Sequence, residues 1–443
     1  MARSTTKELT SGSPMKLILG FAVPLLFGML FQQFYSLMDT IIVGRYLGVT
    51  ALAAVGATGS INFLIIGFCQ GICNGFGLPV AQRFGARDYD GVRKYVGNSA
   101  ILSVLIGGVL TALTVIFCRQ ILVLMQTPSD IIDLSYNYIV VIFAGIPATI
   151  LYNILSSYLR SLGDSITPVI FLIVAAVLNI GLDLLFVVGF HWGIRGAAAA
   201  TVVSQYIAGI GILLYVVVSQ SGRAAGATMK PQKSQQKGML REGFDPVIMK
   251  EIITLSSLTC LQQSVMNFGI LMVQGLVNSF GATTMAAFAA AVKIDTFAYL
   301  PVQDFGNAYS TFVAQNYGVK DYGRIQKGTK EAFAISIVFS IIISILVCTF
   351  AASLMEIFVK AQETAVIACG VQYLRIEGSF YCGIGCLFLL YGYYRAINKA
   401  QMSVVLTVIS LGLRVVLAYI LSVPLKAPGI WVAIVNHKNL KEI

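Results

Sequence analysis

The residues best suited to chemistry in this sequence are acids and amides inside long apolar stretches, where charge is costly and therefore usually functional. Asp183 lies within VLNIGLDLLFVVG, and Asn179 precedes it by four positions, so the two share one face of a helix. Asp39 lies near the end of the first apolar run, on a polar stripe with Gln32 and Tyr35. Their oxygen atoms are suitable ligands for a hard cation, and carboxylates also exchange protons.

A second polar face accompanies these residues. Thr201, Ser204 and Gln205 share a face of a later apolar segment, and Pro24 is a candidate kink upstream of Asp39. Two interpretations are open at this stage. The residues form an ion-exchange site, or they only hold neighbouring membrane helices together by hydrogen bonds.

The second half of the chain carries different ionisable residues in or near its apolar segments. We expect Asp295 to line a substrate cavity, whereas the roles of the others stay open. The others are Lys293, Asp304, Arg375, Glu377 and Arg414.

The amino-acid composition indicates that these residues lie in a lipid bilayer. The chain has 443 residues, of which 57% are apolar and 11% charged, with a mean hydropathy of +0.83. Soluble domains carry roughly 25% charged residues. The composition therefore excludes a soluble enzyme, a disordered chain and a nucleic-acid-binding protein, although the net charge is +11.

Apolar runs of about 20 residues predict eleven membrane helices. They cover approximately residues 16–43, 51–80, 96–118, 133–158, 168–190, 194–218, 251–279, 283–314, 332–355, 364–392 and 403–424. A twelfth run, GIWVAIV from Gly429, becomes polar at Asn436, so we expect a truncated twelfth helix. The first run is too long for a signal-peptide core and is expected to remain as a helix.

Loop charges predict the orientation. If the N-terminus is cytoplasmic, most loop Lys and Arg residues lie on the cytoplasmic side, as the positive-inside rule requires. The longest loop is rich in Gly, Ser, Gln and Lys. We therefore expect a six-helix bundle over 1–218, a flexible cytoplasmic linker over 219–250 and a second bundle over 251–443.

The two halves are related in sequence. A shift of 233 residues places VAQRFGARDYDGVRK (80–94) on VAQNYGVKDYGRIQK (313–327) and LGVTALAAVGA (47–57) on FGATTMAAFAA (280–290). Both halves enter the membrane from the same side, which makes a parallel repeat. Such repeats are typical of alternating-access transporters, whereas a channel or receptor is disfavoured. The same shift places Met272 opposite Asp39, and aligning YLRSLG (158–163) with YYRAIN (393–398) places Ala418 opposite Asp183. The acids therefore do not repeat.

These features together resemble the multidrug and toxic compound extrusion (MATE) transporters, and the DinF-like branch in particular. The resemblance covers nearly the whole chain and depends on several motifs in order. They are Pro24 with QQFYSLMDTIIVGRYLG (32–48), ALAAVGA (51–57), VAQRFGARD (80–88), YLRSLGDSITP (158–168) and LNIGLDLLFVVG (178–189).

The resemblance implies an all-α integral membrane protein of two parallel six-helix bundles, here with the twelfth helix truncated. It implies a H⁺- or Na⁺-coupled antiporter that exports cationic or aromatic drugs. The ion-coupling residues, and the Na⁺ ligands if Na⁺ is the ion, match Asp39, Asn179, Asp183 and Thr201. The cavity-lining Gln and Tyr of the family match Gln32 and Tyr35, and helix 1 would bend at Pro24. We also expect Asn153 and Asp295 in the substrate cavity. Another branch of the family uses an acid in helix 7, and residues 252–279 contain none.

Two other functions stay open. One is a flippase for lipid-linked precursors from the same superfamily, whose cavity would need arginines for pyrophosphate. The other is an inactive, shortened transporter. An enzyme is disfavoured because neither His191 nor His437 lies beside a nucleophile. We expect no cofactor besides the coupling ion, drug molecules and membrane lipid as partners, no nucleic acid, a monomer, and a location in the plasma or inner membrane.

Overall fold

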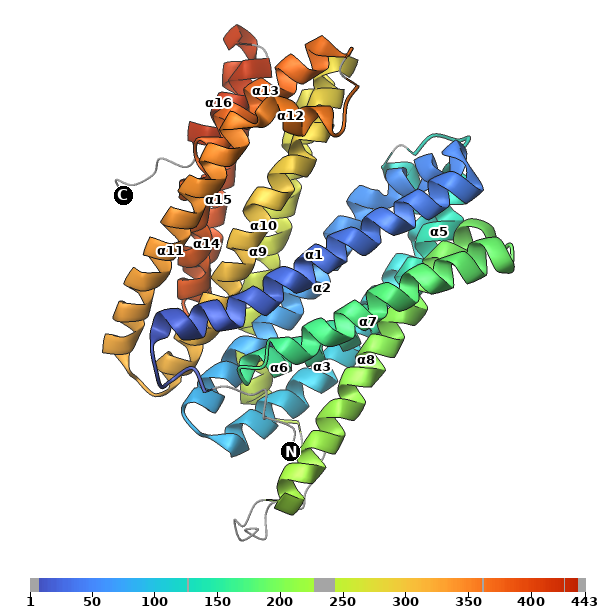
Figure 1. The fold of residues 1–443 in the computed structure, drawn as a ribbon. Coiled ribbons are helices and arrows are strands. Elements are labelled where there is room, and N and C mark those ends of the chain that lie inside the picture. The colour runs from blue at the N-terminus through green and yellow to red at the C-terminus, as the bar shows by residue number, and fades with distance from the viewer. Residues whose placement is uncertain (1–7, 126, 227–243, 361, 426, 437–443) are drawn as a thin grey trace. The chain divides into compact units, whose positions relative to one another are not determined.

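The fold is built entirely from helices over the residues that the computed structural model describes, which are 8–125, 127–226, 244–360, 362–425 and 427–436 (Figure 1). The expected all-α membrane fold is confirmed. In the first half the helices are α1 (Pro14–Leu47), α2 (Val49–Gly85), α3 (Tyr89–Ile116), α4 (Cys118–Leu124), α5 (Ile132–Ala144), α6 (Ile146–Ser161), α7 (Ile166–Asp183), the π-helix η1 (Leu184–Gly189) and α8 (Gly193–Gly226). In the second half they are α9 (Pro246–Asn278), α10 (Ala282–Gly318), α11 (Tyr322–Thr349), α12 (Ala351–Glu356), α13 (Thr364–Gly378), α14 (Tyr381–Ala396), α15 (Ala400–Leu425) and α16 (Ala427–Asn436).

Most of these helices are long and apolar enough to cross a bilayer. Within the described part of the chain, 8 single helices meet this condition, and two pairs of helices meet it only together, α5–α6 with a bend of 43° and α13–α14 with a bend of 51°. The segment expected to span over 251–279 forms the helix α9. The chain is therefore a multi-pass membrane protein.

The internal repeat extends to backbone details. Gly48 and Gly281 precede α2 and α10 with φ of 87° and 88°, values that favour glycine. Asp88 and Asp321 then cap α3 and α11 by accepting a hydrogen bond from a backbone N–H three residues later, at 2.9 Å in both cases. These four positions obey the 233-residue shift, so both halves use the same turn chemistry.

The chain forms two compact units, which are described separately. Unit 1 contains Val23–Cys260 together with the residues before Leu9, and unit 2 contains Leu9–Ala22 and Leu261–Ile443. The chain therefore passes between units inside α1, next to Pro24, and again inside α9. The predicted linker over 219–250 is partly helical, because α8 extends to Gly226 and α9 begins at Pro246. Residues 227–243 of the linker lie outside the described part of the chain.

In unit 1, α7 and α8 lie side by side, and α6 packs against α2 and α8 (Figure 1). The start of α9 packs against α2 through small residues. A Cβ atom added at Gly75 would lie 2.5 Å from the Cα of Ser256, and one added at Gly71 would lie 2.8 Å from the Cα of Cys260. Gly71 and Gly75 thus form a small-xxx-small motif, which allows close approach of membrane helices.

In unit 2, the short helix α16 completes the apolar core. Trp431 is 1% exposed, stacks on Phe288 at 5.5 Å between ring centroids, and meets Tyr373 edge-on at 5.0 Å. The tail HKNLKEI (437–443) lies outside the described residues. The segment expected to be a truncated twelfth helix is therefore a short helix of 10 residues that contributes its largest side chain to the core.

The segment that leads into α1 is also fixed within unit 2. The backbone N–H of Leu9 donates to the Oε1 of Gln315 at 2.9 Å, and the carbonyl of Leu9 accepts from the side chain of Asn316. Arg324 donates to the carbonyl oxygens of Gly12, at 2.6 Å, and of Leu9, at 3.2 Å. The repeated motif VAQNYG therefore positions the beginning of α1.

Candidate functional site

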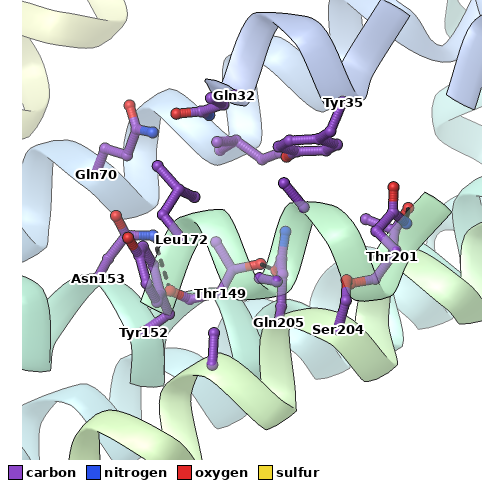
Figure 2. Close-up of a pocket in the computed structure, with 15 residues that line it drawn as sticks. Gln32, Tyr35, Gln70, Thr149, Tyr152, Asn153, Leu172, Thr201, Ser204 and Gln205 are labelled. Carbon is purple, nitrogen blue, oxygen red and sulfur yellow. Dashed lines mark hydrogen bonds between the residues drawn. The ribbon is translucent and has the colours of Figure 1, made fainter. Parts of the chain in front are cut away.

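Unit 1 contains a cavity between α1, α2, α6, α7 and α8, with about 650 Å³ of empty space that includes its open side. Figure 2 shows the labelled side chains converging on it. The lining residues are Gln32, Tyr35, Ile66, Gln70, Thr149, Tyr152, Asn153, Leu172, Ala175, Ala176, Asn179, Thr201, Ser204, Gln205 and Ala208.

Hydrogen bonds fix part of the cavity wall. Thr149 donates to the Oε1 of Gln205 at 2.6 Å, which joins α6 to α8, and Asn153 donates to the carbonyl of Thr149 at 2.8 Å. Gln32 and Tyr35 of α1 lie on the opposite side of the cavity (Figure 2). The helices α1 and α7 approach closely there, because a Cβ atom at Gly28 would lie 3.0 Å from the side chain of Val169.

The cavity wall combines polar and apolar side chains and carries no charged residue. Its polar groups are amides, hydroxyls and phenols, and its remaining lining is aliphatic. Such a wall binds a ligand by hydrogen bonds and by stacking on Tyr35 and Tyr152, and phenol rings also attract organic cations. No arginine is among the lining residues, which leaves this cavity without the fork-shaped donors that hold pyrophosphate.

Behind one part of this wall lies a group of buried oxygen ligands. Asn179 and Thr201 line the cavity, and the amide of Asn179 donates to the hydroxyl of Thr201 at 3.3 Å. Asp183 is 0% exposed and Asp39 is 9% exposed. Within the described residues, neither oxygen of the Asp183 carboxylate has a hydrogen-bond partner, nor do the Oδ1 atoms of Asp39 and Asn179.

The two carboxyl groups lie close enough to interact electrostatically. Two unpaired carboxylates in one buried site repel each other, so the site favours a proton on one of them or a cation between them. Both carry unsatisfied oxygen atoms, which are expensive to bury unless something else binds them. The site therefore contains oxygen ligands suited to an ion.

Sequence reasoning missed one member of this group. Tyr138 of α5 is buried and interacts electrostatically with Asp39, Asp183 and Tyr35. A tyrosine in an apolar helix is usually interpreted as packing, so no pattern singled it out. The structure adds it to the residues that surround the two acids.

A local irregularity follows Asp183. The α-helix α7 ends at this residue, and the chain continues as the π-helix η1. Directly after η1, the backbone N–H of Phe190 donates to the carbonyl of Leu185 at 2.8 Å, five residues earlier, as is typical of a π-helix. Single-turn π-helices occur frequently at functional sites. The sequence carries no clear signal for this element.

The other predicted site residues lie elsewhere. Asp295 is buried in unit 2, where the hydroxyl of Tyr373 donates to it at 3.4 Å, and it is not among the residues that line the cavity. Pro24 lies inside the continuous helix α1. Among the residues that the structure describes, no group of three or more His, Cys, Asp or Glu could hold a metal ion. An ion at Asp39 and Asp183 therefore depends on the amide and hydroxyl groups as further ligands.

Comparison with known proteins identifies relatives over almost the whole chain. The chain is 29% identical to the probable multidrug resistance protein YoeA of Bacillus subtilis, over 93% of this chain and 88% of the relative. It is 24% identical to the probable multidrug resistance protein NorM of Thermotoga maritima, over 89% and 83%.

The fold matches solved transporters. A MOP superfamily transporter from Pyrococcus furiosus superimposes with a TM-score of 0.88 at 23% identity, over 99% of this chain and 95% of the other. The MatE family model matches residues 24–185 and again residues 258–420, in agreement with the internal repeat. The chain belongs to the MATE family, whose members are transporters rather than enzymes.

Proposed function

We propose that this protein is a cation-coupled antiporter that exports cationic or aromatic drugs and toxic compounds across the cell membrane by alternating access. One observation carries the proposal. Asn179 and Thr201 line the cavity and are hydrogen-bonded to each other, and Asn179 lies about one helical turn before the buried Asp183. The names of the relatives, which are multidrug resistance or multidrug export proteins, support the substrate class.

We infer the exchange of drug for H⁺ or Na⁺ from Asn179 and Thr201, which we place at both the drug cavity and the ion site. When H⁺ or Na⁺ occupies the acids, Asn179 and Thr201 turn their dipoles to the ion, which changes the wall that a drug would contact. When a cationic drug enters the cavity, its charge opposes a second cation nearby. The ion does work only because it binds one conformation more tightly than the other. Drug and ion therefore bind alternately.

We assign the protein to the DinF-like branch and place the coupling site in the first half. The motif that supports this assignment is Asn179-x-x-x-Asp183 together with Asp39. The described part of α9 has no acid after Glu251, which argues against a coupling carboxylate there. The uncharged cavity argues against the flippase. We also propose that the protein lies in the plasma membrane as a monomer with a cytoplasmic N-terminus, as loop charges favour.

The test is ethidium efflux from cells that express the chain, with Asp39→Asn and Asp183→Asn as variants. Each substitution removes a charge without removing volume, so we expect at least a tenfold loss of efflux with unchanged amounts of protein in the membrane. Asp133→Asn is the matched control, because Asp133 is exposed, pairs with Arg119 at 3.1 Å and is not among the residues that line the cavity. Full efflux by either site variant would contradict the proposal.

A further inference from the structure

Unit 2 contains a second buried cluster of ionisable groups, which the proposed function does not use. Asp295 of α10 and Glu377 of α13 are 7% and 4% exposed. Tyr373 interacts electrostatically with both carboxyl groups and with Arg414 of α15. Tyr299 interacts with Asp295 and Arg414 as well. Two acids, one guanidinium group and two phenols thus share one environment.

The repeat relates this cluster to the ion site of unit 1. The helices α6 and α14 coincide under a shift of 235 residues, from Ile146–Ser161 to Tyr381–Ala396. The same shift places Tyr373 at the position of Tyr138 and Arg414 at the position of Asn179. In unit 1 these two positions surround the acids Asp39 and Asp183. In unit 2 they surround different acids, and an arginine replaces the neutral amide.

The charge of Arg414 is permanent. A guanidinium group keeps its proton in proteins. The Nε atom of Arg414 is buried and has no hydrogen-bond partner among the described residues. Arg414 as a whole is half-buried, and a half-buried guanidinium group is stabilised by opposite charges nearby. The carboxyl groups of Asp295 and Glu377 lie within electrostatic range of Tyr373, as Arg414 does.

We propose that Arg414 is a resident cation. In unit 2 its guanidinium group neutralises the buried acids, as an exchangeable H⁺ or Na⁺ does for Asp39 and Asp183 in unit 1. The second half of the chain therefore binds no exchangeable ion. The inference about exchange depends on the proposed function of the first site, whereas the electrostatic role of Arg414 does not. It explains why the acids differ between halves although the fold repeats.

The test uses the thermal stability of the full-length purified protein, which is independent of transport. Arg414→Ala leaves two buried carboxylates without their cation. We expect its Tm to fall by about 5–10 °C, as for a broken buried charge pair in a large domain. Millimolar guanidinium chloride, compared with equal KCl, should restore at least half of the loss in this variant and leave the parent unchanged. Arg375→Ala is the matched control, because Arg375 is an exposed arginine of the same unit.

Two further variants keep the proposal falsifiable if Arg414→Ala does not fold. Arg414→Lys keeps the charge and should retain most of the stability, whereas Arg414→Met keeps the length and should lose it. Adding Asp295→Asn to Arg414→Met should then raise the Tm, because it removes an uncompensated charge. Equal Tm values for the Lys and Met variants, or a double variant less stable than Arg414→Met, would overturn the role of Arg414. Neither result would affect the ion site of unit 1.

Discussion

The close approach of α2 and the start of α9 makes a quantitative prediction for Gly75→Ala. The new Cβ atom would lie 2.5 Å from the Cα and 2.9 Å from the Oγ of Ser256. Ordinary carbon contacts lie at roughly 3.5–4.0 Å, so the helices must separate by about 1 Å. Because the nearest atom is backbone, no side-chain rotation relieves the clash.

Overpacking of this kind costs about 1–3 kcal/mol. At about 2–4 °C per kcal/mol for a unit of this size, the Tm should fall by roughly 5 °C. The assay is thermal unfolding of the purified protein in detergent. Gly59→Ala is the matched control, since Gly59 lies on the same helix with nothing within 4 Å of its added Cβ. Any gain in helix propensity is common to both variants and cancels. If Gly75→Ala unfolds at the same temperature as Gly59→Ala, the packing argument is refuted.

Three further predictions concern the core, the start of α1 and the ion site. Trp431→Ala should destabilise unit 2 by about 3 kcal/mol, because it leaves a cavity beside Phe288 and Tyr373; an unchanged Tm would show that α16 is dispensable. Arg324→Ala frees the carbonyl of Gly12, leaves that of Leu9 bound only by Asn316, and should increase proteolysis at the N-terminal segment; an unchanged cleavage rate would contradict the fixed position of that segment. Tyr138→Phe should keep the fold and weaken ion-driven ethidium export severalfold; full export at limiting ion gradients would remove Tyr138 from the ion site.

The helical membrane fold could be predicted from the sequence because long apolar runs and the 233-residue repeat are visible along the chain itself. The bends at α5–α6 and α13–α14 were not predicted, since the segments were interpreted as single spans. Gly71-x-x-x-Gly75 is visible in the sequence as a packing motif, but its partner Ser256 is distant along the chain. Such partners depend on tertiary structure.

The candidate site likewise contains residues that the sequence predicts and residues that only the structure reveals. Asp39, Asn179 and Asp183 stand out because a charge in an apolar stretch is expensive, and the structure places the two acids within electrostatic range of each other. Tyr138 does not stand out, because its phenol is compatible with membrane packing. Asp295 stands out by its charge as well, and its place in a substrate cavity stays a prediction, since the cavity of unit 1 is lined by residues of that unit alone.

The central claim is that a cation bound at Asp39 and Asp183 drives drug out of the cavity that Asn179 and Thr201 line. The most direct measurement is ethidium transport in proteoliposomes with an imposed H⁺ gradient or an imposed Na⁺ gradient. The account predicts transport against the ethidium gradient with one of the two ions, and no ion-driven transport by Asp183→Asn reconstituted in equal amount. Ion-driven transport by Asp183→Asn at the parental rate would contradict it.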